Sequence, residues 1–200
     1  MRDFGSASAA YLAARGGVMS RTLVWITAKN RTTGAAESLG LWTGDDHQDF
    51  SIGGVTRTYY GAGAMLSVDP ITMQAGLVVR MQRMVLSALS PEVTQIFRGY
   101  DPRLAPVEIH RALFDLETHA LIEEPHRVFL GWIEEAPIAT PEIGGQATIE
   151  VTMASSARSM TRALAIKKSD STQRMRGGDR FRRYIDVSGS VGVWWGEKRT

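Results

Sequence analysis

The stretch DFSIGGVTRTYY, from Asp49 to Tyr60, decides the fold of this chain. Its central pair, Gly53-Gly54, is typical of a two-residue turn, because a type I′ turn needs a positive φ at both positions and glycine adopts that φ without a steric penalty. The residues on both sides are rich in β-branched and aromatic side chains, which favour strands. The stretch therefore predicts a β-hairpin with strands at residues 49–52 and 55–60.

Runs of similar composition occur on both sides of this hairpin. They are bounded by turn residues, and several alternate apolar with polar side chains, as a strand with one buried face does. Methionines at both parities of residues 79–85 leave the buried face of that run unassigned. Short strands at near-regular spacing favour a mainly β fold, an antiparallel barrel or sandwich, over alternating strand–helix units. The further predicted strands are residues 23–27, 39–43, 79–85, 107–114, 128–133 and 147–153.

One or two short helices accompany the predicted strands. Residues 6–15 are rich in alanine, and the glycines at 16–17 that follow are predicted to form the C-cap of a helix. A second helix is predicted to begin after Ser90. Ser90 has the pattern of an N-cap, Pro91 suits the first helical position, and Glu92 suits the positive end of the helix dipole.

The composition is that of a folded protein without cysteine. The chain has 200 residues, of which 44% are hydrophobic, and this suffices for a substantial buried core. The lack of cysteine excludes disulfides and thiolate metal sites and indicates a reducing compartment. No apolar stretch approaches the length of a membrane span, and the first residues lack the pattern of a secretory signal. We expect a soluble protein that is made in the cytoplasm and does not bind membranes by itself.

Charge is divided unequally along the chain. Residues 154–200 contain 11 basic and 4 acidic side chains, whereas residues 1–153 contain 12 basic and 17 acidic ones. Such asymmetry is typical of a segment that has a charged partner. The expected organisation is an N-terminal helical segment at 1–20, a β-rich body at 21–154, and a basic C-terminal arm at 155–200 that packs on the body or on a neighbouring subunit.

The arm has features of a protein interface. Residues 155–166 predict a helix, and residues 169–178, rich in Ser, Gln and Gly, predict a loop that orders on assembly. Residues 181–187 alternate apolar and polar side chains and predict a strand packed against another surface. Arginines interleaved with aromatic residues are also what a polyanion-binding segment uses, so that interpretation stays open. The predicted interface residues are Arg174, Arg176, Arg180, Phe181, Arg182, Arg183, Tyr184, Trp194 and Trp195.

No group of side chains indicates an active site. One acidic cluster, Asp45, Asp46 and His47 with Asp49, has carboxylate oxygens of the kind that a hard cation prefers. These residues lack the spacing of an EF-hand calcium loop, so a polar turn before the hairpin fits them better. No serine has the context of a nucleophile elbow, and no histidine has a paired-ligand spacing. A cell-wall hydrolase would need two placed carboxylates, for which Asp45 and Glu134 are candidates. We expect a non-enzymatic protein with no metal or cofactor, in which the adjacent pairs Glu123-Glu124 and Glu134-Glu135 are loop or rim charges.

The order of several motifs resembles a known family. The motifs are LWTGDD at 41–46, the hairpin followed by GAG at 61–63, FLGWI at 129–133, STQR at 171–174, GDRF at 178–181 and VWWG at 193–196. This order, which covers most of the chain from Leu23 onward, resembles the tail-tip (baseplate) hub proteins of siphophages and gene transfer agents.

The resemblance implies a structural role at the tail tip of a virion. It implies a tail-tube-like β-barrel domain that forms a ring and joins the tail tube or distal tail protein to the fibre or spike proteins of the tip. Hub proteins of this kind form trimers with pseudo-sixfold symmetry and distal tail proteins form hexamers, so a ring of either size is expected. Some tail-tip proteins bind an iron–sulfur cluster through cysteines, which this chain lacks. The alternative function is a nucleic-acid- or polyanion-binding module that uses the basic arm.

Overall fold

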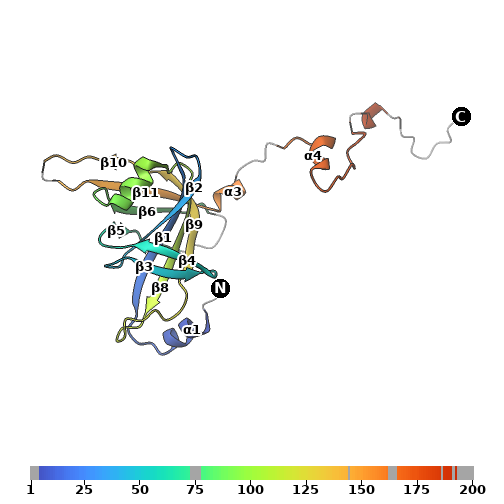
Figure 1. The fold of residues 1–200 in the computed structure, drawn as a ribbon. Coiled ribbons are helices and arrows are strands. Elements are labelled where there is room, and N and C mark those ends of the chain that lie inside the picture. Colours follow the sequence, from blue (N-terminus) through green and yellow to red (C-terminus); the bar gives the residue numbers. More distant parts are fainter. Residues whose placement is uncertain are drawn as a thin grey trace. The chain divides into compact units, whose positions relative to one another are not determined.

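The computed structural model describes residues 5–72, 78–143, 145–161, 166–185, 187–190 and 192 (Figure 1). By its internal contacts the chain divides into two compact units, Met1–Thr161 and Arg162–Thr200. Strands make up 42% and helices 16% of the structure, so the expected mainly β fold is confirmed. No helix in the described part of the chain is both long and apolar enough to cross a membrane.

The first unit is built on one sheet of 11 strands. The main path across it runs β3-β4-β2-β1-β8-β9-β11-β6-β5, while β7 pairs with β1 and β10 with β11. Because β2 and β4 run parallel, the sheet is mixed, and the expected purely antiparallel arrangement is wrong at this pair. Among the described residues the path is open between β3 and β5, so the expected barrel or sandwich is not confirmed. The strands are β1 (Met19–Asn30), β2 (Ala36–Trp42), β3 (Gln48–Ile52), β4 (Val55–Tyr60), β5 (Met65–Val68), β6 (Met81–Ser87), β7 (Tyr100–Asp101), β8 (Pro106–Phe114), β9 (His126–Glu135), β10 (Ile138–Ala139) and β11 (Thr148–Ser155).

Strands β3 and β4 form the predicted hairpin. Gly53 and Gly54 have φ values of 59° and 77°, which are the positive values that the turn requires. Phe50 and Ile52 of β3 are buried, whereas Asp49 is exposed. One face of β3 therefore covers the core and the other faces solvent, as the period of two in a strand dictates.

Strand β1 is buried on both faces, which its continuous apolar run permits. Leu23 belongs to an aromatic cluster that includes Trp42, Phe50 and Tyr59 from β2, β3 and β4. The next residue, Val24, points to the opposite face and belongs to a larger cluster. That cluster combines strands from both halves of the sheet with helix α2 (Pro91–Thr94) and the π-helical turn η1 (Gln95–Gly99). The sheet thus has a core on each face.

Helix α2 begins as predicted. Ser90 Oγ accepts a hydrogen bond from the Val93 backbone N–H at 3.4 Å, Pro91 is the first helical residue, and Glu92 lies in the first turn. The chain then widens into η1, which the sequence did not predict. The apolar side chains of this segment, Val93, Ile96, Phe97 and Tyr100, are all buried.

Helix α1 (Ser6–Ala13) lies beside the connection between β8 and β9 (Figure 1). It ends earlier than expected. Ala14 is its C-cap, and the residue with a left-handed φ, of 54°, is Arg15. The predicted glycine C-cap is therefore wrong by one position, because the Arg15 backbone N–H already closes the last turn on the Leu12 carbonyl at 3.1 Å.

The C-terminal part has less regular structure than expected. The helix predicted at 155–166 is limited to α3 (Arg158–Thr161), because Ser155 is still the last residue of β11; residues 162–165 lie outside the described part. The loop predicted at 169–178 instead begins with helix α4 (Asp170–Arg174). The Ser169 side chain caps α4 by accepting a hydrogen bond from the Thr172 backbone N–H at 3.4 Å. A short 3-10 turn, η2 (Ser188–Ser190), follows near the end.

Candidate functional site

The predicted interface residues that the structure describes lie in α4 and in the chain that follows it. The Asp170 carboxylate forms an ion pair with Arg174 Nε at 2.9 Å and lies 3.9 Å from Arg180 Nη2. Arg183 lies over the ring of Tyr184, 5.4 Å from its centre. A single carboxylate thus gathers two of the arginines at the start of this basic segment.

Within the described part of this segment, other arginines form no such ion pair. Among the described residues, no carboxylate oxygen lies within 4.0 Å of a nitrogen of Arg176, Arg182 or Arg183. The two remaining predicted interface residues, Trp194 and Trp195, lie outside the part of the chain that the structure describes.

The second unit has no apolar core among its described residues. None of its side chains described between Ile166 and Gly192 is buried. Phe181 is 87% exposed and Met175 is 84% exposed, and Tyr184 is also largely exposed. Units below about 40 residues rarely fold alone without a staple, a metal or a partner. This unit therefore presents large apolar and cationic side chains together on its surface.

The strand predicted at 181–187 is wrong. The backbone N–H groups of Arg183, Ile185 and Val187 each donate to the carbonyl three residues earlier, at 2.9, 3.2 and 3.3 Å. A strand needs a ladder partner for these groups, and the described residues of this unit supply none, so local turns satisfy them instead.

An exposed acidic loop precedes the hairpin. The Trp42 indole N–H donates to the Asp46 carbonyl at 2.7 Å, which fixes the loop backbone, while the side chains of Asp45, Asp46 and Asp49 are exposed. None of these carboxylates forms an ion pair with a described residue. In the same described part of the chain, no three His, Cys, Asp or Glu side chains are placed to hold a metal ion.

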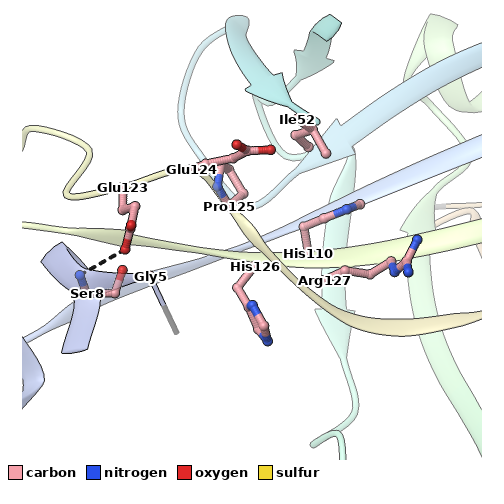
Figure 2. A pocket seen from close by; sticks show the side chains of 9 residues that line it. All are labelled: Gly5, Ser8, Ile52, His110, Glu123, Glu124, Pro125, His126 and Arg127. Atoms are coloured by element: carbon pink, nitrogen blue, oxygen red, sulfur yellow. Dashed lines mark hydrogen bonds between the residues drawn. The ribbon is translucent and has the colours of Figure 1, made fainter. Parts of the chain in front are cut away.

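A pocket lies between the start of α1 and the strands β8 and β9 (Figure 2). Its volume is about 490 Å³. Polar side chains dominate its lining, and Ile52 contributes an apolar wall. The polar lining residues are Ser8, His110, Glu123, Glu124, His126 and Arg127. Figure 2 shows that these side chains come from α1, β3, β8, and the start of β9 with the loop before it.

The two carboxylates of this pocket hold the backbone of neighbouring elements. Glu123 Oε2 accepts a hydrogen bond from the Ser8 backbone N–H at 2.9 Å, in the first turn of α1. Hydrogen bonds from Ser8 lower the pKa of Glu123, which favours the charged form. Glu124 accepts one from the Gly53 backbone N–H at the β3–β4 turn. The loop between β8 and β9 thereby joins α1 to the hairpin, and both carboxylates are occupied in doing so.

Beside the pocket, Glu108 of β8 is the centre of a charged network. Its Oε2 accepts from Arg57 Nη1 at 2.7 Å, its Oε1 lies 3.7 Å from Arg127 Nη1, and its Oε2 lies 3.8 Å from His110 Nε2. Burial opposes ionisation of Glu108, but the hydrogen bond and charge of Arg57 outweigh it, so the pKa of Glu108 is lowered. The Arg57 guanidinium also lies 5.0 Å from the centre of the Trp25 ring.

His110 is the most deeply buried member of this network. It is 2% exposed, and its Nδ1 has no hydrogen-bond partner among the described residues. Burial lowers the pKa of His110 to about 4, and the attraction of Glu108 offsets this only in part. His110 is therefore neutral at pH 7. Arg57 and Glu108 are 51 residues apart, so no local pattern in the sequence indicates this network.

Glu134, the other candidate for a hydrolase carboxylate, forms an ion pair with Arg158 of α3.

No family model matches the chain, and no curated protein matches it.

Proposed function

We propose that this protein is a structural, non-enzymatic subunit of the tail tip of a bacteriophage or phage-like particle. In this role copies of the chain form a ring that joins the tail tube or distal tail protein to the fibre or spike proteins. The order of motifs from Leu23 onward supports the choice of particle, and the mainly β first unit is compatible with it.

One observation carries the proposal: the second unit has no buried side chain among its described residues, yet it presents Phe181, Met175 and several arginines to solvent. Exposed apolar patches of this kind mark sites of association. The acidic first 153 residues and the basic remainder give a subunit two parts of opposite charge, which favours a head-to-tail contact between copies.

Two measurements test the proposal. The purified full-length chain is expected to give the mass of a closed oligomer by light scattering, and a chain that lacks Ser169–Thr200 is expected to give the mass of a monomer. Electron microscopy of particles labelled on this protein should place the label at the tail tip. Label on the capsid, or normal particles assembled from the truncated chain, would contradict the proposal.

A salt titration tests the polyanion-binding alternative. Binding of a phosphate backbone weakens steeply with salt, with a slope set by the number of cations engaged. If the protein is a ring subunit, we expect an oligonucleotide to bind the full-length chain no more tightly than it binds an unrelated protein of similar net charge. Tight, salt-dependent binding of the oligonucleotide that is lost when Ser169–Thr200 is removed would favour the alternative.

A further inference from the structure

We infer that the acidic loop at 43–47 and strand β3 of one copy form the docking site for the basic segment 174–187 of a second copy. This inference rests on the proposed function, because it requires that copies of the chain associate. It adds which surfaces meet.

Charge complementarity favours this contact. Asp45, Asp46 and Asp49 are exposed on the first unit without an ion-pair partner among the described residues. On the second unit Arg176 and Arg183 are exposed and Arg182 is half-buried, and none of the three has an ion-pair partner among the described residues. A polyanion is repelled by the acidic loop, whereas the basic segment of another copy complements it.

The acidic loop is also fixed in shape. Two hydrogen bonds hold its backbone. The Trp42 indole N–H donates to the Asp46 carbonyl at 2.7 Å, and the Ala62 backbone N–H donates to the Gly44 carbonyl at 3.2 Å. A preorganised loop loses little conformational entropy when a partner binds. Asp45 and Asp46 are thus carried by a backbone that is held in place, and the Asp46 carboxylate also accepts a hydrogen bond from the His47 backbone N–H at 2.7 Å.

The backbone of β3 offers a second point of attachment. Within the described residues this strand ends the sheet, with β4 as its one neighbour, so the other edge of its backbone is open. Open edges bind extended segments through main-chain hydrogen bonds. Phe181, Ile185 and Val187 have the same parity and are apolar, which suits such pairing, although residues 181–185 form turns in the single chain. Val55, 59% exposed beside this strand, offers an apolar contact to the same segment.

Charge reversal tests the contact in the full chain. Asp49→Arg is expected to weaken self-association about fivefold, measured by sedimentation, because it replaces an attractive exposed pair with a repulsive one. Asp49→Arg combined with Arg182→Asp in the same chain should restore the association. Glu142→Arg, at an exposed position in the loop between β10 and β11, is the matched control and should leave association unchanged.

Cysteine pairing then identifies the two surfaces directly, since the chain has no cysteine of its own. Asp49→Cys and Arg182→Cys are introduced into separate, differently tagged chains, which are mixed and oxidised. We expect a disulfide between the two tags, and none between Glu142→Cys and Arg182→Cys chains. Because each chain has one cysteine, such a disulfide joins two copies.

The outcomes separate the inference from the proposed function. If the chain associates but Asp49→Arg acts no more strongly than Glu142→Arg, or no Asp49–Arg182 disulfide forms, the inference is wrong and the ring proposal stands. A single chain that carries both Asp49→Cys and Arg182→Cys provides a further check. If its disulfide forms within that chain, the docking site binds the chain's own basic segment, and the inference is again wrong. If the wild-type chain remains a monomer, the proposed function and this inference both fail.

Discussion

Glu108 contacts three basic side chains in the first unit, Arg57, His110 and Arg127. It is held between Arg57 and Arg127 on a half-buried face of β8, so its loss leaves a guanidinium in a site built for a pair. We expect Glu108→Gln to lower the free energy of unfolding by about 1–3 kcal/mol in urea titrations.

The matched control for this substitution is Glu150→Gln. Glu150 lies 3.8 Å from Arg83, and both side chains are more than half exposed. Exposed pairs contribute little, so we expect a change below about 1 kcal/mol. Equal effects of the two substitutions would mean that the Glu108 network has no special part in stability.

His110 gives the first unit a pH dependence with a definite sign. Its folded-state pKa, about 4, lies below the ordinary value of 6.5, so between these two pH values the unfolded chain binds the extra proton. The contribution of His110 to the free energy of unfolding is therefore fully present above about pH 6.5. We expect it to fall by up to about 3 kcal/mol as the pH drops towards 4. Glu108 attracts the proton, while burial, Arg57, Arg127 and His126 oppose it, and burial has the largest effect.

Urea unfolding at several pH values measures this slope. His110→Gln is expected to flatten it between pH 6.5 and 4, and His119→Gln, in an exposed loop, is the control. A wild-type slope that survives in His110→Gln would assign the dependence to other groups.

The β3–β4 hairpin is the element that the sequence predicts best, and its turn offers a direct test. Gly53 and Gly54 both have a positive φ, which costs a residue with a Cβ about 1–2 kcal/mol. We expect Gly53→Ala and Gly54→Ala each to destabilise the chain by that amount in thermal or urea unfolding. Gly16→Ala is the control and should change stability little, since Gly16 has no positive φ and a methyl group there would meet no atom within 4 Å.

Elements defined by local chemistry were predicted, and elements defined by distant partners were not. The Gly53-Gly54 turn and the Ser90 cap depend on a few adjacent residues, and both are confirmed. The buried face of β6, with Gln82, Met84 and Leu86, could not be read from a pattern with methionine on both sides. The parallel pairing of β2 with β4 joins Gly40 and Leu41 to Tyr59 and Tyr60, and no pattern of adjacent residues indicates it.

The candidate sites show the same division between local and distant determinants. The apolar residues Phe181, Ile185 and Val187 have the spacing of a strand face, but such spacing specifies a strand only when a partner ladder is present. In the single chain residues 181–185 form turns instead. The roles of Glu123 and Glu124 were likewise hidden. Their nature as loop charges was expected, whereas their hydrogen bonds to α1 and to the hairpin depend on contacts distant in sequence.

At the scale of the whole molecule, stability and association are expected to reside in different units. Both apolar clusters lie within Met1–Thr161, and none of the described side chains of the remainder is buried. A chain that ends at Thr161 should therefore fold and unfold cooperatively, with a Tm within about 4 °C of that of the full chain measured as a monomer. The peptide Arg162–Thr200 should show no cooperative transition alone, because its described residues form no core that could melt. Calorimetry of the full chain, of the chain that ends at Thr161 and of the peptide Arg162–Thr200 tests this prediction. A large loss of Tm on truncation would mean that the second unit stabilises the first within one chain, which would contradict the assignment of this unit to contacts between copies.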